Sequence, residues 1–217
     1  MLETKYKGYL SPKAALACTS FALGQLGDGL NIFQGIYLVN LGWNEGSVGT
    51  ALSLMGLTAL LVQTFAGDLV DKTTLDRRIF LVIASIVTAM SASAILLVQE
   101  GNQQHGLMYT TKVVEGIASS FIGPSLAAIT LANFGPNHFD PIMASNILWG
   151  HIGSVVSAVM AGGVAYILYP NISLCFLVIG ISALIAIFFV QFVPQGGMIF
   201  CFIILYETMG FFLSVQV

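Results

Sequence analysis

Long apolar runs separated by short polar links dominate the pattern of this chain. A helix that crosses the hydrocarbon core of a bilayer needs about 20 mostly apolar residues, and six runs of the chain meet that length. They cover approximately residues 14–40, 47–70, 79–98, 107–133, 142–168 and 172–193. The links hold turn-forming Gly, Pro and Asn residues and are too short for a soluble domain. The pattern therefore predicts an all-α bundle of six transmembrane helices.

The composition agrees with a membrane bundle that lies in a lipid bilayer. Hydrophobic residues make up 57% of the chain and the mean hydropathy is +0.90, both far above the values of soluble domains. The three cysteines lie inside apolar runs, so they predict neither a disulfide framework nor a metal site. No catalytic or phosphate-binding arrangement can be read from the sequence. We expect a protein that is not an enzyme, binds no nucleic acid and has no cofactor, with coupling to protons left open.

The few basic residues predict the orientation of the helices. Six of the seven Lys and Arg residues precede the first run or follow the second: Lys5, Lys7, Lys13, Lys72, Arg77 and Arg78. The links after the first, third and fifth runs contain no Lys or Arg. By the positive-inside rule, residues 1–13 form a cytoplasmic segment, and the bundle over residues 14–193 has both ends in the cytoplasm.

An apolar tail follows the bundle at residues 194–217. Its run over 198–217 is long enough to span a membrane, holds Glu207 near its middle and lacks flanking charge. It predicts a seventh transmembrane helix, a re-entrant segment or a tail without a structural role.

Polar side chains recur along the first run. Gln25, Asp28 and Asn31 are three residues apart, and Gln34 lies one step further, so a continuous helix would place them on one face. Asp28 falls near the middle of the membrane, where a carboxyl costs a few kcal/mol and usually faces a cavity or a partner. Asp28 and Asn31 are therefore candidates for substrate contact or protonation, and the alternative is a buried acid held by polar neighbours for packing.

The fourth run contains a base and an acid, Lys112 and Glu115, that share a helix face. Lys112 lies about two turns from the outer end of this helix. One interpretation is that Lys112 extends outward and pairs with Glu115 alone. The other is that Lys112, Glu115 and Asp28 form a polar cluster in a central cavity, whose pairing changes when an acid takes a proton.

The fifth run is rich in small residues and holds a single histidine. Gly150, Ser154, Ala158 and Gly162 repeat every four residues, a pattern that lets neighbouring helices approach closely. His151 interrupts this pattern. We interpret it either as a proton relay or as a histidine held by a hydrogen bond between helices.

The charged stretch Gly67–Arg78, between the second and third runs, carries a family resemblance. Its characteristic members are Gly67, Asp71, Lys72, Arg77 and Arg78. It resembles the signature loop of the major facilitator superfamily of secondary transporters, although Thr74 stands where the second Gly of that loop belongs and the basic pair falls late. The stretch Lys112–Gly116, followed by Gly123-Pro124, is similar to the fourth-helix motif of the family, with Lys112 in place of the usual Arg.

The resemblance extends to other runs and covers residues 20–190. Asp28-Gly29 in the first run, and Asn146 and His151 in the fifth, resemble a poorly characterised, bacterial-type branch of the superfamily. The glycine-proline antiporter signature of the fifth helix is not evident, which disfavours drug/proton antiport.

The resemblance implies a fold and a mechanism. The six helices would be the amino-terminal half of a transporter, built from 3+3 inverted repeats, and two such halves rock about a midplane site. The loop with Asp71 would act as a cytoplasmic gate against the other half, and Asp28 and Lys112 would face the cavity that holds a small solute. Proton coupling would follow if Asp28 or Glu115 titrates differently in the two states.

The length of 217 residues corresponds to one half of such a transporter. We expect a fragment or truncated product, a chain that pairs with a second copy, or a chain that docks on another half. The alternative function is that of a non-transporting regulatory or vestigial half that associates with a full-length membrane partner.

Overall fold

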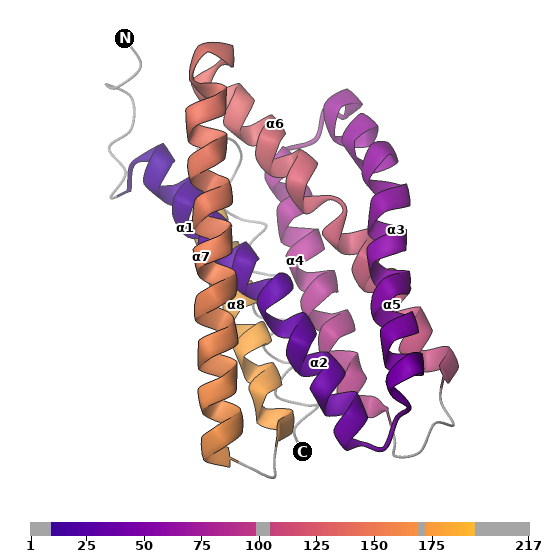
Figure 1. Cartoon of the computed structure of the whole chain (residues 1–217). Coiled ribbons are helices and arrows are strands. Elements are labelled where there is room, and N and C mark those ends of the chain that lie inside the picture. The colour runs from indigo at the N-terminus through magenta and orange to yellow at the C-terminus, as the bar shows by residue number, and fades with distance from the viewer. Residues whose placement is uncertain (1–9, 99–104, 169–171, 194–217) are drawn as a thin grey trace.

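The computed structural model describes residues 10–98, 105–168 and 172–193, without the side chains at positions 28–30, 32, 172 and 175. These residues form a bundle of helices (Figure 1). In chain order the elements are α1 (Pro12–Leu26), α2 (Asp28–Asn40), α3 (Glu45–Lys72), α4 (Arg77–Ala94), η1 (Ile95–Leu97), α5 (His105–Ser119), α6 (Ile122–Phe134), α7 (Pro136–Leu168), η2 (Ile172–Phe176) and α8 (Leu177–Val190). The predicted all-α bundle is confirmed, and the predictions for residues 1–9 and for the tail over 194–217 lie outside the described residues.

The six predicted runs correspond to six spans, three of which are interrupted. The first is divided at Gly27 into α1 and α2, the fourth between Ser119 and Ile122 into α5 and α6, and the sixth into η2 and α8. Four helical segments of the described chain are long and apolar enough to cross a membrane. Two are the single helices Glu45–Lys72 and Pro136–Leu168, and two combine consecutive elements, Arg77–Leu97 (α4 and η1) and His105–Phe134 (α5 and α6).

Two details of the helix ends follow from helix chemistry. The predicted fourth run breaks between Ser119 and Ile122, ahead of Gly123-Pro124, and Pro124 lies in the first turn of α6, where its missing N–H is not needed. The stretch Gly67–Arg78 is not all loop, since α3 continues through Lys72 and only residues 73–76 link it to α4. The ion pair of Lys72 with Asp68, one turn earlier, stabilises this last turn of α3.

The helices pack into two groups that α4 connects. In one group α1 lies between α7 and α8, and in the other α3 and α4 pack on α5 (Figure 1). One buried apolar cluster surrounds Trp43 and Met108, and a second surrounds Leu16 and Leu81. The two clusters lie at opposite ends of the bundle, because Leu16 and Leu81 stand early in α1 and α4 whereas Trp43 follows α2 and Met108 begins α5.

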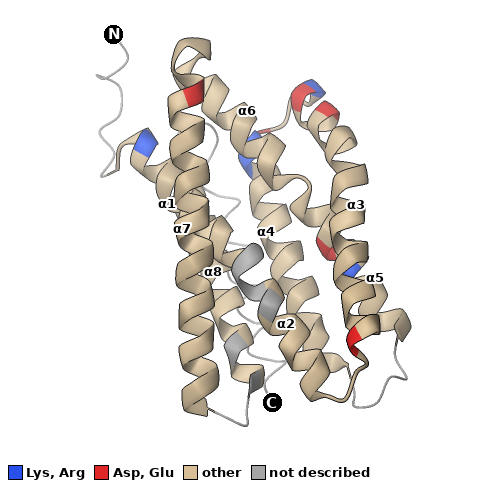
Figure 2. Ribbon diagram, in the orientation of Figure 1, with Lys and Arg blue, Asp and Glu red and all other residues tan. Residues whose placement is uncertain are grey.

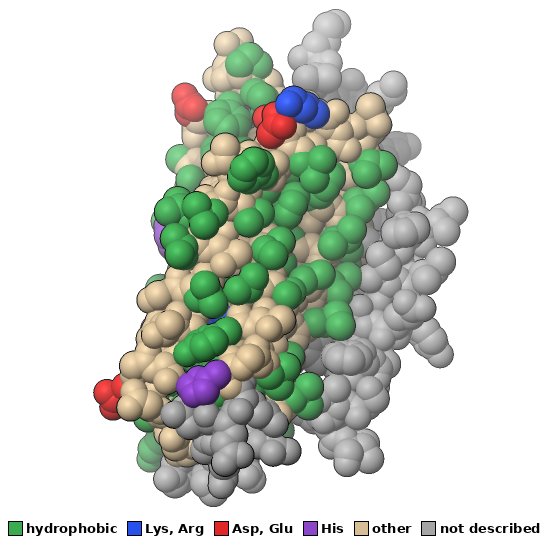
Figure 3. Space-filling model, turned by 90° about the vertical axis from the view of Figure 1, so that its right-hand side faces the viewer, with side chains coloured by type: hydrophobic (Ala, Val, Ile, Leu, Met, Phe, Trp, Pro, Cys, Tyr) green, Lys and Arg blue, Asp and Glu red, His purple; other side chains and the backbone are tan. Residues whose placement is uncertain are grey.

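The outer helices α3 and α7 expose apolar faces. Of the 18 consecutive residues that make up the most apolar part of each helix, only 11% are buried in α3 and 17% in α7. The corresponding share in the segment Arg77–Leu97 is 56%. Figure 3 shows the face that includes α3, with apolar side chains spread over its middle and the prominent acidic and basic side chains at its ends. Such a face requires lipid or protein cover.

Small residues bring α1 and α7 into backbone contact, as the pattern of the fifth run predicts. A Cβ atom on Gly24 would collide with the carbonyl of Gly150, and one on Gly153 with the carbonyl of Phe21. At the same crossing the Ser154 hydroxyl donates to the carbonyl oxygen of Gly24 over 2.9 Å. The contact therefore depends on the absence of side chains at these glycines.

Gly153→Ala is expected to lower the free energy of unfolding by about 1–3 kcal/mol, because the added methyl group forces α1 away from α7. Gly163→Ala is the matched control, since nothing lies within 4 Å of a Cβ at that position of the same helix. Thermal unfolding of the two purified variants in detergent measures the difference. Equal stability would show that α1 and α7 do not approach as closely as described.

Candidate functional site

A buried ion pair lies on α5, at about half its length. The Nζ atom of Lys112 is 2.7 Å from Oε2 of Glu115, and the two side chains are 0% and 5% exposed. The residues are three apart, so both project from one face of the helix. Lys112 is about 10 Å from the start of α5, by the rise of 1.5 Å per residue. The lysine therefore does not reach a surface of the bundle, and its charge depends on Glu115.

A residue of α2 connects to this pair. The amide nitrogen Nε2 of Gln34 donates to Oε1 of Glu115 over 3.4 Å, so the carboxylate is shared between Lys112 and Gln34. Gln34 is itself buried. We refer to Gln34, Lys112 and Glu115 as the midplane cluster, a name taken from the midplane site that the family resemblance implies. The sequence analysis placed Gln34 on the polar face of the first run but did not count it among the candidate site residues. Its partner, Glu115, lies on a helix distant in sequence.

The midplane cluster has unused hydrogen-bonding capacity. The buried Oε1 atom of Gln34 and, one turn earlier on α2, the buried Oδ1 atom of Asn31 accept no hydrogen bond from the described residues. Buried acceptors are ordinarily paired with protein or water. A polar solute, a water molecule or a proton donor could satisfy these atoms. Asp28 begins α2, and its side chain lies outside the described residues.

The continuous polar face expected from Gln25 to Gln34 does not form. Gly27 separates α1 from α2, and Gln25 remains on α1. There its Oε1 atom accepts from the hydroxyl of Ser182 on α8 over 3.2 Å, and its carbonyl accepts from Ser157 on α7. Gln25 therefore joins three helices and is a packing residue.

His151 belongs to a separate, smaller pocket. It is exposed on α7 and, together with Ser20, Asn146 and Ser154, lines a cavity of about 220 Å³ between α1, α6 and α7. Asn146 donates to the Thr130 hydroxyl over 3.1 Å, whereas the buried Ser20 hydroxyl has no partner among the described residues. The structure thus does not bring His151 to the midplane cluster.

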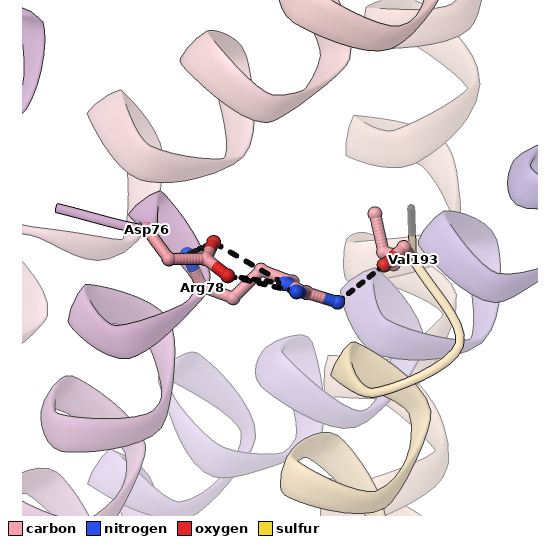
Figure 4. A network of polar contacts seen from close by, with 3 residues as sticks. All are labelled: Asp76, Arg78 and Val193. Atoms are coloured by element: carbon pink, nitrogen blue, oxygen red, sulfur yellow. Dashed lines mark hydrogen bonds and ion pairs between the residues drawn. The ribbon is translucent and has the colours of Figure 1, made fainter. Parts of the chain in front are cut away.

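The charged loop residues divide into exposed and buried groups. Asp71 and Lys72 are exposed at the end of α3, where Gly67 is half-buried. Arg78, by contrast, is only 9% exposed. Its guanidinium binds both carboxylate oxygens of Asp76 and donates through Nη1 to the carbonyl oxygen of Val193 over 2.6 Å (Figure 4).

Asp76 is a residue of this loop that the sequence interpretation missed. It is the N-cap of α4, accepting from the backbone N–H of Arg78 over 3.1 Å. The signal was present, since an Asp directly before a helical run is a preferred cap. The contact with Val193 has no comparable signal, because 115 residues separate Arg78 from it.

Glu115→Gln is expected to lower the free energy of unfolding by about 3–5 kcal/mol, because it leaves the charge of Lys112 buried without a counter-charge. The double variant Lys112→Met/Glu115→Gln removes both charges and should recover most of this loss. Thermal unfolding in detergent ranks the two. A double variant that is less stable than Glu115→Gln alone would contradict a buried ion pair.

The comparisons with known proteins agree with this architecture. A family model described as the Major Facilitator Superfamily matches residues 16–198. Two relatives from Mycobacterium tuberculosis strains, CDC 1551/Oshkosh and ATCC 25618/H37Rv, are each called an uncharacterized MFS-type transporter and are 33% identical over 187 residues. The match covers 84% of this chain and 42% of each relative, so the chain spans less than half of their length.

No solved structure matches the chain. The family-model match nevertheless extends over all six spans, and it includes the charged loop, the midplane cluster and the pocket at His151. The chain belongs to the major facilitator superfamily, a family of membrane transporters rather than enzymes.

Proposed function

We propose that this chain forms one half of an alternating-access transporter that moves a small solute together with protons. The observation that carries the proposal is the midplane cluster, a buried acid and base linked to a second helix, beside an amide oxygen that has no partner in the described part of the chain. Ionisable groups inside a membrane bundle are rare and mark substrate or proton pathways. Transporters of this architecture bind near the midplane, between two sets of helices.

Protonation of Glu115 supplies a way to couple a proton to a conformational change. When Glu115 is ionised, its charge balances that of Lys112, and the cluster is stable in the buried state. A proton on Glu115 removes the balance and leaves Lys112 buried and unpaired, which costs several kcal/mol. The protonated chain therefore favours a state in which Lys112 meets water or another acid, and Asp28 is the candidate acid from the sequence.

The distribution of charge supports a cytoplasmic loop between α3 and α4. Among the described residues, every Lys and Arg except Lys112 lies at the end of the bundle that holds the start of α1 and this loop (Figure 2). By the positive-inside rule that end faces the cytoplasm. Asp71 is exposed there and is available to the second half of a transporter as a gate, while Arg78 holds the loop to the end of α8.

A second candidate function is that of a non-transporting half that binds a full-length relative. This alternative would use the exposed apolar faces of α3 and α7, which extend along both outer helices and suit a helical partner as well as lipid.

Proteoliposomes that contain the chain and a trapped pH-sensitive dye test proton coupling. A panel of sugars, amino acids and organic acids is added outside, and a solute that drives proton entry identifies transport. Lys112→Met/Glu115→Gln should abolish this proton entry, whereas Asp140→Asn, which changes an exposed acid in the first turns of α7, should leave it unchanged. Solute uptake against pH in Asp28→Asn then assigns the proton site, because an unchanged pH dependence would count against Asp28.

Proton entry that persists in the double variant would refute the midplane cluster as the coupling site. If no solute in the panel moves protons, cross-linking in native membranes distinguishes the alternatives. A defined dimer supports two halves acting together, and a monomer without uptake supports the non-transporting function.

Arg78→Gln is expected to lower the free energy of unfolding by about 1.5–3 kcal/mol, because it removes charge-assisted hydrogen bonds and leaves the buried carbonyl of Val193 unpaired. Arg77→Gln is the matched control, since the ion pairs of the described residues include none for Arg77. Thermal unfolding and limited proteolysis within residues 73–76 measure the effect. Equal behaviour of the two variants would show that the contact with Val193 does not hold the loop.

A further inference from the structure

An apolar groove lies between α1, α7 and α8, near the end of the bundle that carries the basic residues. It has a volume of about 640 Å³, within the range of sites that enclose organic ligands. Its inner wall is formed by Ala17, Phe21, Trp149, Ile185 and Phe189. The groove is separate from the midplane cluster and from the pocket at His151, with which it shares no lining residue.

The polarity of the groove changes along its length. Ser11 and Lys13, both exposed, line it at the start of α1, whereas Ala14, Ala17 and Phe21 continue along the following turns. By the helical rise, Phe21 is about 12 Å deeper than Lys13. A cation and a hydroxyl therefore stand at the water-facing mouth, and aliphatic and aromatic groups stand further into the membrane.

This gradient suits one class of occupant. A phospholipid places its phosphate at the membrane surface and its acyl chain in the apolar layer, and a basic residue close to the membrane surface favours an anionic headgroup. The exposed indole of Trp149, about 20 Å from the start of α7 by the helical rise, belongs to the deeper, apolar part of the groove. The N-terminus of α1 adds a weak positive potential in the same place.

We propose that this groove is a binding site for an anionic phospholipid of the leaflet that faces the basic end. Lys13 and Ser11 bind the headgroup phosphate, and an acyl chain lies against Ala17, Phe21 and Phe189. The lipid covers the apolar surface where α1 meets α7 and α8, and it thereby supports the same helix crossing that Gly24 and Gly153 allow.

Photocross-linking in nanodiscs tests the site. The full chain is placed in nanodiscs of phosphatidylcholine that contain a small fraction of phosphatidylglycerol bearing a diazirine on its acyl chain, or the matched phosphatidylcholine probe. Mass spectrometry then locates the labelled peptides. The phosphatidylglycerol probe should label residues 14–21 and 185–189 about five-fold more than the phosphatidylcholine probe, as expected for about 1 kcal/mol from one lysine near the membrane surface.

Two variants separate the headgroup contact from the groove. Lys13→Gln should make the labelling by the two probes equal, whereas Lys72→Gln, which removes an exposed lysine from the same end but on α3, should keep the preference. Ala17→Trp fills the groove and should abolish labelling there by both probes while labelling of α3 continues.

Three results would overturn the proposal. Equal labelling of the wild type by both probes would show a groove without headgroup selectivity. Absence of label from residues 14–21 and 185–189, with α3 labelled, would show that protein rather than lipid covers the groove. If the Lys13→Gln variant still prefers the phosphatidylglycerol probe, Lys13 does not bind the headgroup. This result stands even if Ala17→Trp fails to fold.

Discussion

A lysine charge buried inside a membrane bundle is the constraint on which the rest of this structure depends. Lys112 has no exposure, so its charge must be balanced within the protein, and Glu115 provides the balance at 2.7 Å. The pair also requires close packing around it. Gly116 follows Glu115 and lets α3 approach α5, since a Cβ there would come within 3.0 Å of the side chain of Thr58. Gln34 then closes the cluster from α2.

The two groups of helices therefore differ in what holds them. The group of α1, α7 and α8 is held by glycine contacts and by serine hydroxyls that donate to backbone and to Gln25. In the other group α3 and α4 pack on α5, the helix that carries the charged pair. α2 continues the span of α1 and contacts the pair through the hydrogen bond from Gln34 to Glu115, so the charged pair is linked to the element that follows the break at Gly27. This geometry is the physical basis of the proposed coupling.

Much of the fold could be predicted from the sequence because the bilayer imposes simple rules. The lengths of the apolar runs located all six spans, the spacing of Lys112 and Glu115 predicted their pairing, and the small residues of the fifth run predicted the close approach to another helix. The family resemblance carried by residues such as Asp71 was confirmed by the family-model match. These features depend on local sequence, where composition and periodicity are sufficient.

The remaining features depend on contacts between distant residues. The contact of Gln34 with Glu115 and the hydrogen bond from Arg78 to Val193 are set by tertiary packing, over separations of 81 and 115 residues. The end of α3 was misjudged because charged residues were taken as loop, although Asp68 and Lys72 stabilise one another within a helix.

The ionisation of the midplane cluster can be measured directly by infrared spectroscopy. The difference spectrum between the wild-type chain and Lys112→Met/Glu115→Gln, at neutral pH in lipid, isolates the carboxyl group of Glu115. An ion pair predicts that the wild type contributes carboxylate stretching bands that the variant lacks. A band from a protonated carboxyl group in their place would contradict the buried ion pair and, with it, the proposed coupling of a proton to movement.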